Sequence, residues 1–562
     1  MIHSATVTQP ANIASFLERA AGERPHALAV ASPAGRDRAG RLWYARLSYR
    51  ELHERSARIA RGLESFGIGR GVRTVLMVRP GLDLFCLVFG MFRAGAVPVL
   101  IDPGIGRRHL KRCIENAEPG AFIGIPAAQL ARLAFRWGRR TVRRRVTVGG
   151  RVRGLGARLA DIERLGGRLG PGEAAATSAD ETAAIVFTSG STGPPKGVIY
   201  RHANFFAQIE AIRDLFDLRP GEIDLPTFPL FALFDPAVGM TTVIPDMDPT
   251  RPARVDPRRI IEPIQDLGVS MMFGSPALLD TVGRWGVEHG VKLPTLRSVL
   301  SAGAPVSPQI IERFASLLPE GARILTPYGA SEALPVTAIE SREILAETRH
   351  GTDRGAGVCV GQPVPSISLE VIRVSDDELP VWDDQLRAPR GAVGEIVVKG
   401  PHVTDAYYNA PRHDRLAKIR DADGAVRHRM GDLGYRDESG RLWFVGRKSH
   451  RVVTPDGPLD TIPCEGVFNT HSAVRRSALV GVELDGSTVP VLVVELETVA
   501  RRSDRTAIRA ELLEIGASHE HTKGIRRILF HRAFPVDIRH NAKIGRERLA
   551  HWAARQLRRS GE

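Results

Sequence analysis

Apolar and polar residues in the first quarter of the chain follow two alternating periods. Residues 47–68 (LSYRELHERSARIARGLESFGI) place apolar side chains at helical spacing, and residues 71–78 (GVRTVLMV) form an apolar run of strand length. Residues 84–103 (LFCLVFGMFRAGAVPVLIDP) predict a helix as far as Gly95, followed by a strand. Helices that alternate with short apolar strands predict a mostly parallel sheet with helices packed on its faces.

The alternation continues in the middle of the chain and then changes character. Residues 183–187 (AAIVF) predict a short buried strand, whereas residues 369–374 (LEVIRV) and 394–400 (GEIVVKG) predict a β-rich subdomain. The last fifth of the chain has the pattern of a small α+β domain. Because 562 residues are too many for one compact core, we expect two domains, over residues 1–445 and 446–562.

The net charge suggests nucleic acid as a partner, but the distribution of the basic residues argues against it. The formal net charge of +15 is typical of nucleic-acid binding, but only 8 of the 78 basic residues are Lys and the arginines are spread along the chain. Without zinc-finger spacing or an RNA-binding aromatic signature, we expect no nucleic-acid partner. The densest cluster, residues 131–155, predicts either a solvated basic loop or a docking patch for a protein partner or an anionic lipid surface.

The spacing of the cysteines and the length of the apolar runs predict where in the cell the protein works. The four cysteines lie far apart without a C-x-x-C pair, which indicates neither a disulfide framework nor a zinc site. The N-terminus lacks the charged-then-apolar order of a signal peptide, and the apolar run 84–92 is too short to span a bilayer. We therefore expect a cytoplasmic protein, with peripheral membrane contact left open.

One short segment has the composition of a phosphate-binding loop. Residues 188–197 (TSGSTGPPKG) combine three glycines with four hydroxyl side chains and one lysine, directly after the predicted strand 183–187. Backbone N–H groups, hydroxyls and an ammonium group suit an anion. The nucleoside-triphosphatase loop requires Ser or Thr after the lysine, whereas Gly197 follows Lys196 here. The alternative is a flexible turn rich in Gly and Ser.

Nine segments in a fixed order place this loop in a wider pattern. Together they resemble the adenylate-forming enzymes, a superfamily that includes acyl-CoA synthetases, luciferases and the adenylation domains of peptide synthetases. The segments are LSYREL (47–52), FRAGAVPVLIDP (92–103), TSGSTGPPKG (188–197), SAGAPV (301–306), YGASE (328–332), GEIVVKG (394–400), MGDLGYRDESGRLWFVGRK (430–448), IPCEGV (462–467) and AKIGR (542–546).

The resemblance implies an ATP- and Mg²⁺-dependent enzyme and assigns roles to individual residues. Glu332, with Thr188, is implied to bind Mg²⁺, and Asp432 to accept the ribose hydroxyls. Lys543 is implied to bridge the substrate carboxylate and the α-phosphate, so Lys543, Glu332 and Lys196 are the expected catalytic residues. The implied nucleotide-binding residues are Thr188, Ser189, Gly190, Ser191, Thr192, Gly193, Lys196, Gly303, Ala304, Tyr328, Gly329, Ala330, Ser331, Asp432 and Arg447.

The resemblance also implies an α/β fold. It has a large N-terminal domain of stacked, mostly parallel sheets with a β-rich subdomain, and a small mobile α+β C-terminal domain that carries Lys543. Because Lys543 and the phosphate loop lie on different domains, domain closure is expected to precede the chemistry.

Several positions depart from the pattern of thiol-transferring members. Ala232 stands where many acyl-CoA synthetases have His, Ser449 stands at the usual hinge Asp or Lys, and Ala542 precedes the C-terminal lysine. The stretch 228–253 is most similar to a narrower group, the β-lactone synthetases of bacterial long-chain olefin biosynthesis. That resemblance implies adenylation of a 2-alkyl-3-hydroxy fatty acid, followed by attack of its own 3-hydroxyl to give a β-lactone and AMP.

Ring closure calls for a base and for an apolar pocket. Asp235 is a candidate base, with a loop-capping Asp before Pro236 as the alternative. The expected pocket walls are Phe231, Phe234, Met272 and Phe273. Alternative functions are a medium- or long-chain fatty acyl-CoA synthetase, a fatty acyl-AMP ligase and a non-catalytic scaffold. The pathway implied by the resemblance supplies expected partners, which are a condensing enzyme, a ketone reductase and a β-lactone decarboxylase.

Overall fold

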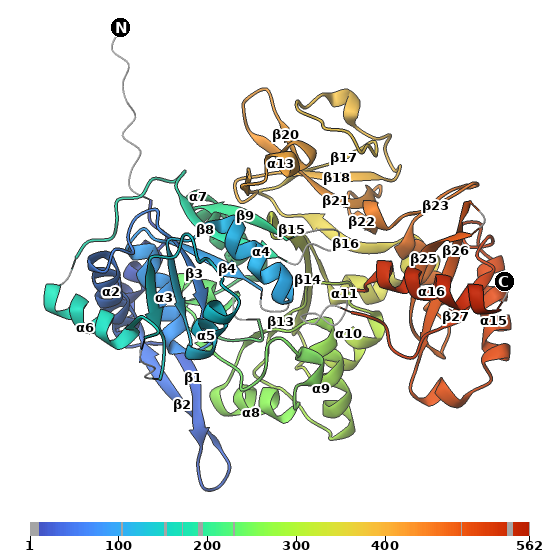
Figure 1. Cartoon of the computed structure of the whole chain (residues 1–562). Helices are drawn as coiled ribbons and strands as arrows, with labels where there is room; N and C mark the ends of the chain where they lie inside the picture. Colours follow the sequence, from blue (N-terminus) through green and yellow to red (C-terminus); the bar gives the residue numbers. More distant parts are fainter. Residues whose placement is uncertain are drawn as a thin grey trace.

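The structure is a computed structural model in which two large sheets are followed by a smaller C-terminal domain (Figure 1). Both large sheets belong to the N-terminal part of the chain, and the C-terminal domain lies at one end of the molecule (Figure 1). The structure describes residues 11–102, 105–150, 154–170, 172–188, 195–228, 231–484, 486–536 and 543–560.

The first large sheet is mostly parallel and has helices on both faces. Its order is β19-β9-β8-β4-β3-β5-β6-β7, and among the described strands β9 and β19 alone run antiparallel to their neighbours. One face packs on α2 and α3, and the other on α4 and the buried Trp137. The strands are β3 (Arg73–Met77), β4 (Val97–Ile101), β5 (Ala121–Gly124), β6 (Arg144–Thr147), β7 (Ala157–Arg158), β8 (Thr182–Thr188), β9 (Lys196–Arg201) and β19 (Tyr407–Tyr408).

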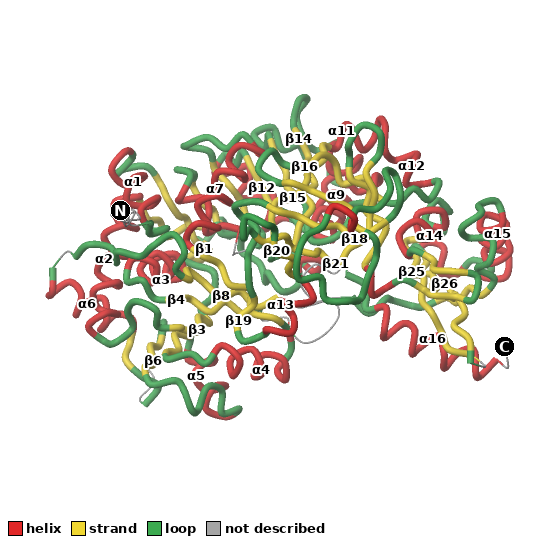
Figure 2. Tube along the Cα trace, turned by 90° about the horizontal axis from the view of Figure 1, so that it is seen from above, coloured by secondary structure: helices red, strands yellow, loops and turns green. Residues whose placement is uncertain are grey.

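Helix α2 of this half begins at a capping box that its sequence provides. Ser48 precedes α2 and accepts a hydrogen bond from the Glu51 backbone, while the Glu51 carboxylate accepts one from the Ser48 backbone at 2.7 Å. The helices are α1 (Ser15–Glu23), α2 (Tyr49–Ser65), α3 (Leu82–Arg93), α4 (Arg107–Ala117), α5 (Pro126–Ala134), α6 (Leu159–Leu169) and α7 (His202–Phe216). Figure 2 shows α4 and α5 next to each other at the rim of the molecule.

The second large sheet joins a mainly parallel half to an antiparallel half. Strands β1 and β10–β14 pair in parallel, and from β15 onward the described pairings are antiparallel, which confirms the predicted β-rich region. The parallel half contains β1 (Leu28–Arg36), β2 (Leu42–Ser48), β10 (Ile223–Pro226), β11 (Thr241–Val243), β12 (Met271–Phe273), β13 (Ser298–Leu300) and β14 (Arg323–Ala330). The antiparallel half contains β15 (Ala333–Glu340), β16 (Val358–Pro363), β17 (Ser368–Ile372), β18 (Gly394–Lys399), β20 (Lys418–Arg420), β21 (Val426–Arg436) and β22 (Leu442–Arg447).

Helices also accompany the second sheet. Helices α8, α9 and α10 supply apolar side chains to the same core cluster as its strands. The elements are η2 (Phe231–Ala237), η3 (Pro252–Arg254), α8 (Arg258–Leu267), α9 (Pro276–Glu288), α10 (Pro308–Ala315), α11 (Ser341–Glu343), η4 (Ile344–Thr348), α12 (Arg349–Asp353), η5 (Asp384–Leu386) and α13 (Pro411–Ala417).

The C-terminal domain is built on a three-stranded sheet whose two faces are covered by separate core clusters. The strand-like runs 489–496 (VPVLVVEL) and 527–534 (RILFHRAF) of the sequence correspond to β26 and the start of β27, whereas β25 was not predicted. The boundary at residue 446 stays a prediction, since β22 runs through it to Arg447. The elements are η6 (Lys448–His450), β23 (Val452–Thr454), β24 (Gly457–Leu459), α14 (Thr461–Phe468), β25 (Val474–Leu484), β26 (Ser487–Leu496), η7 (Val499–Arg502), α15 (Arg505–Ala517), β27 (Arg527–Phe530) and α16 (Arg546–Ser560).

The α/β class and the division into a large and a small part are confirmed. None of the helices in the described ranges is long and apolar enough to cross a membrane.

Candidate active site

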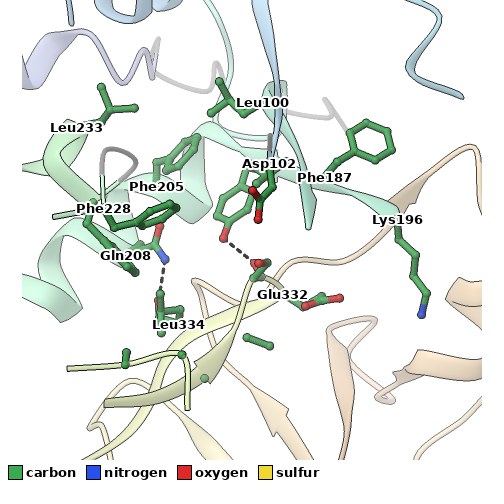
Figure 3. Close-up of a pocket in the computed structure, with 18 of the residues that line it drawn as sticks. Leu100, Asp102, Phe187, Lys196, Phe205, Gln208, Phe228, Leu233, Glu332 and Leu334 are labelled. Atoms are coloured by element: carbon green, nitrogen blue, oxygen red, sulfur yellow. Dashed lines mark hydrogen bonds between the residues drawn. The ribbon is translucent and has the colours of Figure 1, made fainter. Parts of the chain in front are cut away.

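A cavity of about 600 Å³ is lined by residues of both large sheets and by Lys543 of the C-terminal domain (Figure 3). One part of its lining is charged and includes Lys196, Glu332 and Arg447. The rest is largely apolar, with many aromatic side chains. This division matches a substrate that has an anionic end and a long apolar body.

The predicted phosphate loop connects two strands that hold its ends together. Thr188 at the end of β8 pairs in register with Lys196 at the start of β9. Burial lowers the pKa of Lys196, which the Glu332 carboxylate opposes, and the ammonium lies 5.2 Å from the centre of the Tyr407 ring. The loop assignments themselves, Ser189, Gly190, Ser191, Thr192 and Gly193, lie outside the described residues.

Glu332 lies in a group of buried polar side chains. The Tyr407 hydroxyl donates a hydrogen bond of 2.6 Å to Glu332 Oε1. The Lys418 ammonium donates to the Thr404 carbonyl oxygen at 2.5 Å and lies 5.3 Å from the centre of the Tyr407 ring. Tyr407 therefore contacts Lys196 and Lys418 through its ring and the Glu332 carboxylate through its hydroxyl. These contacts hold the four side chains close together beside the cavity.

The charge state of Glu332 follows from these neighbours. Burial alone would raise its pKa, yet the pKa of Glu332 is lowered by His428, the Tyr407 hydroxyl and Lys418. Burial depresses the pKa of His428 to about 3, so this imidazole is neutral at pH 7 and the lowering at that pH comes from Tyr407 and Lys418. Glu332 is thus an ionised carboxylate that lines the cavity.

The donor set fits Mg²⁺ held between protein and phosphate. No group of three or more His, Cys, Asp or Glu side chains that could hold a metal ion occurs among the described residues. Mg²⁺ is commonly bound by one or two carboxylates together with substrate phosphates, and Glu332 is a single ionised carboxylate on the same cavity as Lys196.

Asp432 is a buried carboxylate, and one of its two oxygens has no hydrogen-bond partner. It is buried, accepts a hydrogen bond of 2.8 Å from the Tyr328 hydroxyl through Oδ2, and lies 3.3 Å from Arg447 Nε through Oδ1. Oδ1 is buried without a hydrogen bond, an arrangement that a ribose hydroxyl would complete. Neither Asp432 nor Tyr328 lines the cavity, whereas Gly431, Arg447 and Gly329 do. Stacking of Tyr328 on adenine therefore stays a prediction.

Lys543 reaches the same cavity from the other domain. It lines the cavity that Lys196 and Glu332 also line, and its charge lowers the pKa of Asp432, which burial raises overall. The structure thus brings together three of the predicted catalytic residues, from β9, from the turn after β14 and from the segment before α16.

The predicted adenine segments also border the cavity. Gly303 lines it with φ of +96°, a conformation that a side chain would strain. Gly329, Ala330 and Ser331 line it as well, whereas Ala304 does not.

The apolar part of the cavity confirms most of the predicted walls. Phe231, Phe234 and Phe273 line it, together with Phe89 and Phe92 of α3. The assignment of Met272 is wrong, because its side chain is fully buried in the core cluster formed with α8 and α9 and does not line the cavity.

Asp235 does not line the cavity, which the geometry of its helix explains. It lies on the 3₁₀ helix η2, in which side chains three residues apart share a face. Phe231, Phe234 and Ala237 share the face that lines the cavity, whereas Ala232 and Asp235 share a buried face. Asp235 there accepts a hydrogen bond of 2.8 Å from the Thr242 hydroxyl and faces Asp224. This placement does not support Asp235 as a base for substrate.

Sequence reasoning missed several residues of the site. Tyr407 comes from β19 at the edge of the first sheet, whereas Lys418 and His428 come from β20 and β21 of the second, and no local motif marks them. Lys418 is one of only eight lysines, a scarcity that would have singled it out. Asp102 was also missed as a functional residue, although its carboxylate is directed into the cavity from the end of β4 (Figure 3).

Comparisons with known proteins agree with this geometry. The chain is 53% identical over 98% of its length to an olefin beta-lactone synthetase of Xanthomonas campestris pv. campestris, of which it covers 99%. It is 51% identical to an olefin beta-lactone synthetase of Stenotrophomonas maltophilia, with the same coverage of both chains. A 2-succinylbenzoate–CoA ligase of Bacillus cereus is 24% identical over 78% of this chain and 81% of the relative.

Solved structures show the same fold at lower identity. An amide bond synthetase of Marinactinospora thermotolerans has a TM-score of 0.77 at 22% identity, over 96% of this chain and 99% of that one. An ATP-bound enzyme of Rhodopseudomonas palustris has a TM-score of 0.74 at 20% identity, over 97% of this chain and 99% of that one. Residues 17–408 match the AMP-binding enzyme family, and the chain belongs to that family.

Proposed function

We propose that the protein is an ATP-dependent β-lactone synthetase of long-chain olefin biosynthesis. It adenylates a 2-alkyl-3-hydroxy fatty acid with release of pyrophosphate and then closes the β-lactone with release of AMP. The observation that carries this function is the identity of 53% to an olefin beta-lactone synthetase over nearly the whole chain. The cavity supports it, since lysines from both domains line one part and phenylalanines another.

The first step joins two anions, so the site supplies positive charge. Lys543 would hold the substrate carboxylate against the α-phosphate and stabilise the charge that grows on the phosphorus, while Lys196 would hold the outer phosphates. Glu332 would hold Mg²⁺, which when bound neutralises phosphate oxygens. The apolar walls exclude water and so protect the acyl-adenylate from hydrolysis.

The second step is intramolecular. The 3-hydroxyl loses its proton, its oxygen attacks the acyl carbon, and the bond from that carbon to the phosphate oxygen of AMP breaks. Fixing the hydroxyl against the carbonyl replaces an encounter with a second substrate. We assign the proton acceptor to Asp102, because its carboxylate lines the cavity between apolar Leu100 and Phe187 (Figure 3), whereas Asp235 is turned into the core.

One incubation tests the function. The protein is given ATP, Mg²⁺ and a racemic 2-alkyl-3-hydroxy acid, with and without CoA, and the products are identified. A β-lactone formed without CoA supports the proposal, whereas a thioester formed only with CoA supports a fatty acyl-CoA synthetase. Accumulation of free acyl-adenylate would indicate a fatty acyl-AMP ligase.

A pair of variants tests the base. Asp102→Asn is expected to keep ATP–pyrophosphate exchange and to lose lactone formation about a hundredfold or more, since general-base catalysis contributes on that order. Asp235→Asn is the matched control and should keep both reactions. Equal lactone rates in the two variants would remove Asp102 from the mechanism.

The pathway implies partners and a location. We propose that the protein works in the cytoplasm with a ketone reductase upstream and a β-lactone decarboxylase downstream. Co-purification of the three enzymes from cells that express them together would test the assembly.

A further inference from the structure

Large apolar side chains are exposed side by side on α5 and the turn that follows it. Leu130, Leu133 and Phe135 have exposed fractions of 54%, 47% and 42%, and they are three of the eleven exposed large hydrophobic residues in the described part of the chain. Leu130 and Leu133 are three residues apart and so lie on one side of the helix. The neighbouring side of the helix is held against the protein by buried Gln129 and Arg132.

The surroundings of these side chains carry one sign of charge. Residues 119–160 contain ten arginines and no Asp or Glu. Arg136, Arg139, Arg140 and Arg143 are exposed, and within the described ranges none of them has a carboxylate partner within 4 Å. Elsewhere in the described part of the chain many arginines pair with acids, as Arg55 does with Asp83, whereas these four do not.

The packing shows why the segment stays in this orientation. Trp137 is 4% exposed and packs into the core cluster that contains Phe122 and Ile114, and Phe135 stacks on it with ring centres 5.5 Å apart. Gln129 Nε2 donates a hydrogen bond of 3.0 Å to the Val146 carbonyl oxygen on β6. The apolar side chains are therefore fixed outward, at the rim of the molecule where Figure 2 shows α5 beside α4.

We propose that α5 and the arginine-rich turn form a docking surface for an anionic lipid membrane. Leu130, Leu133 and Phe135 would enter the boundary between headgroups and acyl chains, and the arginines around them would contact lipid phosphates. Each arginine near an anionic surface contributes about fivefold to partitioning, so four of them with an apolar anchor suffice for reversible binding. The four arginines and the absence of acidic residues give this surface a single sign of charge, which complements the phosphates of an anionic membrane.

Sedimentation with vesicles tests the surface independently of any activity. The full-length chain is mixed with sucrose-loaded vesicles that contain phosphatidylglycerol, or with vesicles of phosphatidylcholine alone. Binding is expected only to the anionic vesicles and should weaken with rising salt, because the Debye length is about 8 Å at physiological ionic strength.

Two variants and two matched controls locate the binding. Arg139→Gln with Arg140→Gln should weaken partitioning about thirtyfold, and replacement of Leu130, Leu133 and Phe135 by Ser should weaken it about tenfold or more. Val453→Ser with Val499→Ser, and Arg501→Gln with Arg502→Gln, change exposed residues of the C-terminal domain and should bind like the wild type. ATP–pyrophosphate exchange in solution reports whether each variant is folded.

The outcomes separate lipid from protein as the partner. Failure of the wild type to sediment with anionic vesicles overturns the proposal, as does unchanged binding by both patch variants. If the patch variants bind vesicles normally but no longer co-purify with other enzymes of the pathway, the surface is a protein interface and the lipid assignment is wrong.

Discussion

Replacing Asp235 by Asn distinguishes a structural carboxyl group from a catalytic one. Asp235 and Asp224 are buried facing each other, with the Thr242 hydroxyl donating to Asp235. Burial raises the pKa of Asp224 to about 7 and that of Asp235 well above its usual value. At neutral pH the pair therefore keeps at least one proton, which lies between the two carboxyl groups.

The magnitude follows from linkage. A carboxyl group with a pKa of about 4 in the unfolded chain and about 7 in the folded chain costs about 4 kcal/mol when fully ionised in the core. Because the folded-state pKa is raised, the stabilisation is complete below pH 4 and is lost as the pH rises through 7. The wild type should therefore lose unfolding free energy between pH 5 and pH 8, by a few kcal/mol at most.

Asp235→Asn removes one of the two ionisable groups while its amide keeps polar contacts to Asp224 and Thr242. We expect the variant to lose less unfolding free energy than the wild type over the same pH range, by on the order of 2 kcal/mol. Urea unfolding at several pH values measures this difference, and lactone formation is assayed beside it. A pH profile identical to that of the wild type, or loss of lactone formation with pyrophosphate exchange intact, would refute the reasoning.

Three further changes probe the adenylation site. Lys543→Ala should lower the rate of pyrophosphate exchange about a hundred- to a thousandfold with little change in folding, since it removes charge stabilisation in the transition state; exchange at the wild-type rate would contradict this role. Asp432→Asn should raise KM for ATP about tenfold or more, because a charged acceptor near the ribose is lost; a change confined to the KM for the acid would place Asp432 elsewhere. Tyr407→Phe removes a donor that lowers the pKa of Glu332, so the acid limb of the exchange rate should move to higher pH, as a pH–rate profile would show.

Local patterns were sufficient for the strand before the loop. The apolar run 183–187 lies within β8, whereas β9, which begins at Lys196, was not predicted. The prediction of β8 depends on residues next to each other in the chain. The helix within 84–103 and the strand after it were predicted for the same reason, and α3 and β4 confirm them.

The side chains that surround Glu332 could not be predicted from local sequence patterns. Tyr407 follows Glu332 by 75 residues, and its place is fixed by the pairing of β19 with β9. Only after two distant strands pair does its hydroxyl meet the carboxylate. The orientation of Asp235 was missed for a different reason, since no secondary structure was predicted for residues 231–237, which form a 3₁₀ helix with a three-residue repeat.

The pairing of β19 with β9 also links the two halves of the nucleotide site. Tyr407 on β19 pairs with Val198, two residues after Lys196, and its hydroxyl binds Glu332. Lys196 and Glu332, for which we propose phosphate and Mg²⁺ binding, are therefore linked through one strand pair and the Tyr407 hydroxyl within the large domain. Lys543 comes from the small domain, so we propose that the approach of that domain decides when adenylation begins.

This division of labour suits an acceptor that is already bound. A separate acceptor such as a thiol would have to enter the cavity after adenylation. On the proposed function the 3-hydroxyl of the substrate would already occupy the apolar part of the cavity, so ring closure would not require Lys543 to move away from Lys196 and Glu332. We therefore propose that neither half-reaction needs a second arrangement of the domains, which fits the presence of Ser449 at the expected hinge position.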